Sequence, residues 1–142
     1  MKIYTSLLLL LLSYSAKADT ITTWNVYYNH KLIKQFKANP EVKEIQIKAS
    51  DYSSGDYLAI QYGDDMPCHT CSYELTVVAE GKDPIFTLTT KDKYKFMTID
   101  LKAILSKFKS KNGNRFFVVY FTEIDEKGKR NSGSRLFNIK IS

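Results

Sequence analysis

The chain has few of the residues from which common catalytic and metal sites are built. It contains only two histidines, His30 and His69, and only two cysteines, Cys68 and Cys71. It also lacks a Gly-x-Ser-x-Gly elbow, a phosphate-binding glycine loop and a His-Glu-x-x-His pair. We therefore expect a protein that is not an enzyme and that carries no cofactor.

Long apolar runs are missing as well, except near the start of the chain. Lys2 precedes an apolar run centred on 7–12, and Ala16-Lys17-Ala18 supplies the small residues that signal peptidase accepts. The pattern predicts a signal peptide over 1–18, cleaved after Ala18, followed by one domain over 19–142. The alternative is a membrane anchor, but the apolar segment has about ten residues, whereas a spanning helix needs roughly 20. We expect a secreted or periplasmic protein that does not span the membrane after cleavage.

Concentrated charge is also missing. The formal net charge is +6, and the lysines are scattered along the chain. Nucleic-acid-binding proteins usually have basic residues gathered in one patch or stripe. Scattered basic charge and the predicted export together argue against a nucleic-acid partner.

What the chain does have is a series of short segments that alternate apolar and polar residues between turn residues. They cover 22–28, 32–36, 44–48, 57–62, 73–79, 85–89, 94–97, 116–121 and 137–141. Segments of this length and spacing predict an all-β, mainly antiparallel sandwich of 8–9 strands, immunoglobulin-like in a loose sense. Residues 116–121 are almost continuously apolar, which predicts a central strand buried on both faces.

One segment has the period of a helix. Four apolar residues occupy the i, i+3, i+4 and i+7 positions of one helical face: Leu101, Ile104, Leu105 and Phe108. Either Thr98 or Asp100 can cap the first turn. The sequence therefore predicts one short helix near 99–109.

The order of these motifs is similar to that of a known group of proteins. The predicted domain opens on Trp24-Asn25-Val26-Tyr27-Tyr28-Asn29, continues with Leu58-x-Ile60-x-Tyr62, and ends, after the helix, with Arg135-Leu136-Phe137-x-Ile139. In this it resembles small exported β-sandwich proteins of Bacteroidota-type bacteria. The resemblance covers most of 19–142. It implies a sandwich fold and carries no known activity or site residues.

The segment 66–71 holds the chain's densest group of chemically active side chains. In an oxidising compartment Cys68 and Cys71 are expected to form a disulfide, which contributes about 2 kcal/mol in the chain-entropy model. The alternative is a soft-metal site for copper or zinc, with Met66, Cys68, His69 and Cys71 as ligands. A redox-active pair is a third interpretation, but such cysteines lie at a helix N-terminus, and no helix is predicted here.

Exposed aromatic and basic side chains give candidates for a binding surface. Tyr27, Tyr52, Tyr57 and Tyr94 can contact a ligand, and Lys93 and Lys95 flank Tyr94. The alternative for the lysines is a solvated edge strand. We expect a binding module or a structural accessory subunit, with a protein or carbohydrate ligand in the envelope or outside the cell.

Overall fold

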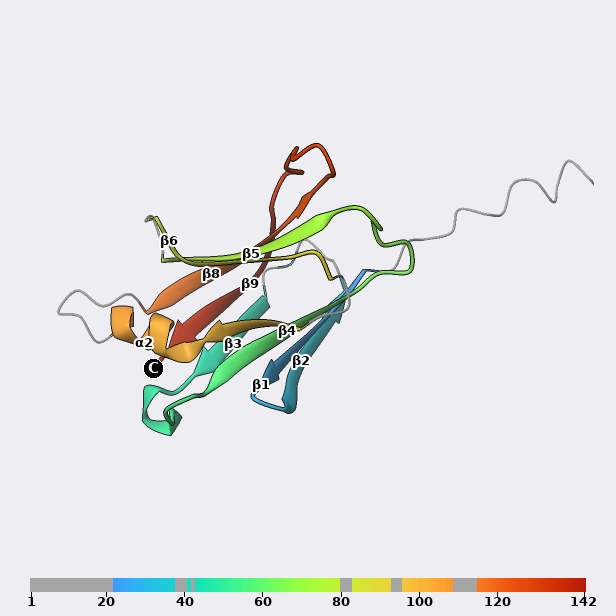
Figure 1. The fold of residues 1–142 in the computed structure, drawn as a ribbon. Helices are drawn as coiled ribbons and strands as arrows, with labels where there is room; N and C mark the ends of the chain where they lie inside the picture. Colours follow the sequence, from blue (N-terminus) through green and yellow to red (C-terminus); the bar gives the residue numbers. More distant parts are fainter. Residues whose placement is uncertain (1–21, 38–40, 42, 80–82, 93–95, 109–114) are drawn as a thin grey trace, which may run out of the picture.

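The computed structural model describes residues 22–37, 41, 43–79, 83–92, 96–108 and 115–142 (Figure 1). The strands are β1 (Thr23–Tyr28), β2 (Lys31–Lys37), β3 (Lys43–Ile47), β4 (Tyr57–Gly63), β5 (Ser72–Ala79), β6 (Pro84–Thr90), β7 (Met97–Asp100), β8 (Phe116–Ile124) and β9 (Ser134–Ile141). The helices are a single 3₁₀ turn, η1 (Ala49–Asp51), and the α-helix α2 (Leu101–Phe108). The predicted signal peptide lies outside the described residues. No helix among those described is long and apolar enough to cross a membrane.

The strands form two sheets that face each other. One sheet has the order β2-β1-β4-β7 and the other β3-β9-β8-β5-β6. Every described pair is antiparallel except β3 and β9, which run parallel. The predicted all-β, mainly antiparallel sandwich is therefore confirmed.

Alternation along the strands places the core between the sheets. On β1, Trp24 and Val26 face inward and are almost fully buried, and their partners on β4 are Tyr62 and Ile60. Successive side chains on a strand point to opposite faces, so the intervening residues of β1 face outward. At one end of the core, four aromatic rings contact one another: Trp24, Tyr62, Tyr73 and Phe121.

The prediction for residues 116–121 is wrong in one respect. β8 does lie in the middle of its sheet, between β5 and β9. However, Phe117, Val119 and Phe121 are buried, whereas Phe116 is 38% exposed and Val118 is half-buried. The second sheet covers only one face of β8. The apolar residues on the other face lie on the outside of the sandwich, so an apolar run did not imply burial on both faces.

The helix closes one side of the sandwich. α2 buries Leu101, Ile104 and Leu105 and contacts β4, β6 and β7, so it packs where the edge strands β6 and β7 meet. Asp100 is its N-cap, because its Oδ1 accepts a hydrogen bond of 2.8 Å from the backbone N–H of Lys102. The predicted helix is confirmed over its described part.

The region before the helix differs from the prediction. The expected strand over 94–97 falls partly on 93–95, which lie outside the described residues. The observed strand β7 begins at Met97 and continues to Asp100. Thr98, the alternative cap, precedes Asp100 in this strand, and Asp100 is the residue directly before the helix.

Candidate binding groove and the disulfide loop

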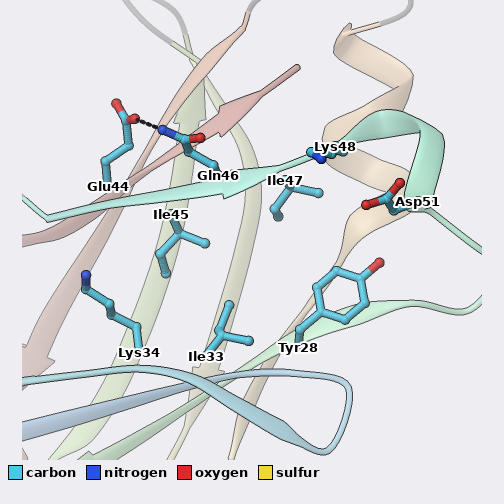
Figure 2. A pocket seen from close by; sticks show the side chains of 9 residues that line it. All are labelled: Tyr28, Ile33, Lys34, Glu44, Ile45, Gln46, Ile47, Lys48 and Asp51. Atoms are coloured by element: carbon cyan, nitrogen blue, oxygen red, sulfur yellow. Dashed lines mark hydrogen bonds between the residues drawn. The ribbon is translucent and has the colours of Figure 1, made fainter.

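A groove lies between the edge strands β2 and β3, which are the sheet edges away from β7 and β6 (Figure 2). Its volume is about 480 Å³, within the range typical of pockets for small ligands. The lining residues come from β1, β2, β3 and η1: Tyr28, Ile33, Lys34, Glu44, Ile45, Gln46, Ile47, Lys48 and Asp51.

Strand β3 contributes two isoleucines to the floor of the groove, Ile45 and Ile47, which are only 5% and 4% exposed. Ile45 and Ile47 alternate on its inner face and point toward β2 in Figure 2. The parallel register with β9 fixes this orientation by pairing Ile45 with Ile139 and Ile47 with Ile141. Glu44 and Gln46 point away from Ile45 and Ile47, and Gln46 Nε2 donates a hydrogen bond of 3.1 Å to Glu44 Oε1. The carboxylate of Glu44 is thereby turned from the apolar part of the groove.

A bulge in β2 supplies the opposite wall. Val26 pairs with Lys34 but Tyr27 pairs with Leu32, so Ile33 is the extra residue. A bulge re-aims side chains at a sheet edge, and Ile33, although 39% exposed, lines the groove. Leu32 is 47% exposed and shares the outward face of its partner Tyr27. Leu32 and Ile33 are thus similarly exposed, but Ile33 faces the groove and Leu32 faces the outside of the sheet.

Tyr28, at one end of the groove, is held in place by Asp56. The Asp56 carboxylate accepts hydrogen bonds from the Tyr28 hydroxyl (2.6 Å), from Asn29 Nδ2 (2.9 Å) and from the backbone N–H of Ser53 (2.8 Å). Burial, and then the bond to Asp56, raise the pKa of Tyr28 to about 12. The Tyr28 ring that lines the groove is therefore neutral and fixed at physiological pH.

The second candidate region is the disulfide loop at the aromatic end of the core. Cys68 and Cys71 form a disulfide, with their Cα atoms 5.5 Å apart, as the sequence predicts. Cys71 is buried, and the Tyr73 hydroxyl donates a hydrogen bond of 2.8 Å to the backbone carbonyl of Cys68. The buried Cys71 and this hydrogen bond therefore attach the disulfide loop to the aromatic end of the core.

Two of the four predicted ligands lie at the surface: the side chain of Met66 is 66% exposed, and His69 is exposed. The other two, Cys68 and Cys71, lie beside a carboxylate, since an oxygen of Glu123 and both Sγ atoms lie within 4.8 Å of one another. Glu123 is far from the two cysteines in the sequence, and the pairing of Tyr73 with Glu123 brings it beside the loop. The sequence alone therefore did not indicate this residue.

The predicted surface residues do not form one site among the described residues. Tyr52 is half-buried against the core and lines a separate hollow, together with Tyr57. Tyr27 lies on the outer face of its sheet, where its ring contacts Phe96 with centroids 5.3 Å apart. Lys93, Tyr94 and Lys95 lie outside the described residues.

The comparisons with known proteins give no relative to draw on. No protein-family model matches the chain, and no curated protein or solved structure matches it. The fold defines an all-β sandwich with a helix at one pair of edge strands and a groove at the other pair, and any function is argued from that geometry.

Proposed function

We propose that this protein is an exported, non-catalytic binding module that holds an extended segment of a partner protein in the groove between β2 and β3. The observation that carries this proposal is the difference between the two pairs of edge strands. α2 packs where β6 and β7 meet, whereas β2 and β3 bound a groove of about 480 Å³ with both apolar and charged lining residues.

The chemistry of the groove favours an extended chain with apolar residues at alternate positions. β3 pairs with β9 on one side only, and an edge strand offers backbone N–H and C=O groups to a further strand. Every second side chain of such a segment would point into the groove. Main-chain hydrogen bonds to β3 would provide affinity, and Ile33, which is 39% exposed, would favour apolar residues above the buried Ile45 and Ile47.

β2 is less suited than β3 to pair with the partner. The bulge at Ile33 interrupts its regular pattern, and Lys34 pairs with the inward-facing Val26. Bulges and inward-pointing charges are features that protect an edge strand from pairing. The partner segment is therefore expected to align along β3 and to contact β2 through side chains alone.

The acidic groups that line the groove make local hydrogen bonds. The Glu44 carboxylate accepts the Gln46 hydrogen bond, and Asp51 Oδ1 accepts one of 2.9 Å from Ser50 Oγ. A bound segment would therefore meet carboxylates whose positions are already held by neighbouring side chains.

A displayed library of random heptapeptides tests the proposal, with immobilised protein lacking residues 1–18 as the target. We expect the protein to enrich peptides whose apolar residues alternate, and mass spectrometry to recover them chemically unchanged. Ile33→Asp should weaken their binding at least tenfold, because it replaces the exposed apolar side chain of the groove with a carboxylate. Leu32→Asp is the matched control, since Leu32 is similarly exposed but faces outward.

Two results would contradict the proposal. One is equal binding of the enriched peptides to the Ile33→Asp variant and to the unmodified protein. The other is a library that yields no alternating apolar peptides although the protein is folded by circular dichroism.

A further inference from the structure

Glu123 occupies a position in the sheet that normally holds an apolar residue. It pairs with Tyr73, which is 1% exposed and faces the core, and it follows the inward-facing series Phe117, Val119 and Phe121 along β8. Cross-strand partners share a face, so Glu123 also faces inward. One of its oxygens accepts a hydrogen bond of 3.2 Å from Asn131 Nδ2.

This inward-facing carboxylate lies beside the disulfide. A carboxylate oxygen of Glu123 and both sulfur atoms lie within 4.8 Å of one another. Cys-x-x-Cys is a spacing at which two thiolates bind one zinc ion. In tetrahedral coordination with Zn–S distances near 2.3 Å, the two sulfurs would be roughly 3.8 Å apart. The bond between the two sulfurs must therefore be broken before both can bind one ion.

We propose that Cys68, Cys71 and Glu123 form a zinc site that is closed by the disulfide and opened by its reduction. This proposal is independent of the partner groove. A dithiol reductant supplies two electrons and two protons, becomes a disulfide itself, and leaves two thiols on Cys68 and Cys71. Zn²⁺ then displaces both thiol protons and binds two thiolates and the Glu123 carboxylate, with water as the fourth ligand.

The donor set selects zinc over softer ions. Two thiolates and one carboxylate form a mixed sulfur and oxygen set, which suits a borderline ion such as Zn²⁺. Cu(I) prefers sulfur alone, whereas the third donor here is a carboxylate oxygen. With a single Glu123 carboxylate and a water, the site also differs from closed structural zinc sites, which have four protein ligands.

Zinc titration of the chain lacking residues 1–18 tests the proposal, with a chromophoric chelator as competitor. The oxidised protein is compared with protein reduced by a phosphine, which binds zinc weakly. We expect the reduced protein to bind one Zn²⁺ per chain and the oxidised protein to bind none. Glu123→Gln should weaken zinc binding by at least about tenfold, because it removes a charged ligand. Glu126→Gln, in the same hairpin but outside the cluster, should bind zinc as the unmodified protein does.

The test remains decisive if reduction loosens the fold. Metal binding then restores β-structure, because the site forms only in the folded chain and the free energy of zinc binding therefore stabilises that state. Circular dichroism of the reduced chain should therefore recover on addition of Zn²⁺. The proposal is overturned if the reduced chain binds no zinc, if it stays unfolded with zinc present, or if Glu123→Gln binds zinc as tightly as the unmodified protein.

Discussion

The Tyr62 hydroxyl donates a hydrogen bond of 2.6 Å to Oδ2 of Asp64. Asp64 also accepts bonds from the Thr22 hydroxyl and from the backbone N–H of Met66. Because the Tyr62 ring packs against Trp24, this carboxylate links the aromatic core to the start of the disulfide loop. Burial, followed by the bond to Asp64, raises the pKa of Tyr62 above its ordinary value.

The same contacts make the fold sensitive to acid. Burial alone would raise the pKa of Asp64, but the hydrogen bonds from Tyr62, Met66 and Thr22 outweigh it and lower that pKa below 3.8. A carboxyl with a lowered pKa in the folded state stabilises that state above its unfolded pKa. This contribution is lost as the pH falls below 3.8 and through the folded value.

Urea unfolding between pH 7 and pH 2 measures this dependence. We expect the free energy of unfolding to fall more steeply below pH 3.8 for the unmodified protein than for Asp64→Asn. The difference between the two proteins should be largest at neutral pH and shrink in acid. Asp83→Asn, an exposed position at the start of β6, serves as the control for charge removal. An equal acid dependence in Asp64→Asn would contradict the role of Asp64.

The elements that sequence predicts best are those whose burial follows from local pattern. The alternation of Trp24 and Val26, and the helical spacing of Ile104 and Leu105, both match the observed buried faces. In these elements one face packs on the core and the other meets solvent, so periodicity reports the packing directly. β8 does not follow this pattern, because apolar residues also occupy its outer face.

The groove and the Glu123 cluster depend on pairings between distant segments. The parallel pairing of β3 with β9 orients Ile45 and Ile47, and the bulge at Ile33 appears only in the register of β1 with β2. Glu123 meets Cys71 through the pairing of β5 with β8. The identities of neighbouring residues do not determine register between distant strands. The groove and the position of Glu123 were therefore not predicted, whereas Cys68 and Cys71 were.

Removing the disulfide should destabilise the protein modestly. Cys68 and Cys71 close a very short loop, for which the chain-entropy model gives about 2 kcal/mol. We expect the double variant Cys68→Ser, Cys71→Ser to lose about that much free energy of unfolding in urea. Reduction of the unmodified protein, measured without metal, should cause a similar loss. No loss in either measurement would show that the bond does not stabilise the fold.

The N-cap of α2 should stabilise the folded protein independently of the disulfide. Asp100→Ala removes the acceptor of the Lys102 N–H bond, and loss of such a cap costs about 1 kcal/mol. Asp100→Asn and Asp100→Ser keep an acceptor and should retain most of the stability. Thermal and urea unfolding of the three variants measure the effect. If Asp100→Ser is as unstable as Asp100→Ala, the hydrogen bond is not the cause.

Export predicts a defined first residue. Expressed at full length in a bacterial host with a secretion pathway, the chain should be recovered outside the cytoplasm with Asp19 at its N-terminus. Ala18→Phe should block cleavage, because signal peptidase requires a small residue before the cut. Lys17→Ala is the control, since the middle position of the small-x-small pattern tolerates many residues. N-terminal sequencing of the exported protein checks this, and an intact 1–18 segment would refute it.

The role of α2 in closing one side of the sandwich can be tested at Ile104, which is fully buried. Ile104→Ala leaves a cavity at this position, and such changes cost about 2–5 kcal/mol. Lys102→Ala, on the exposed face of the helix, should change stability by less than about 0.5 kcal/mol. Urea unfolding gives both values.

Binding of a fluorescent apolar dye distinguishes two roles of α2: covering the edges of β6 and β7, and packing in the core. If α2 covers these edges, its loosening exposes apolar surface there. The Ile104→Ala variant should then bind the dye under native conditions. Peptides selected for the β2 and β3 groove should still bind this variant, because the residues that line the groove do not come from α2. Loss of peptide binding together with dye uptake would mean that the groove and α2 are not independent. Destabilisation without dye uptake would mean that Ile104 stabilises the core without covering these edges.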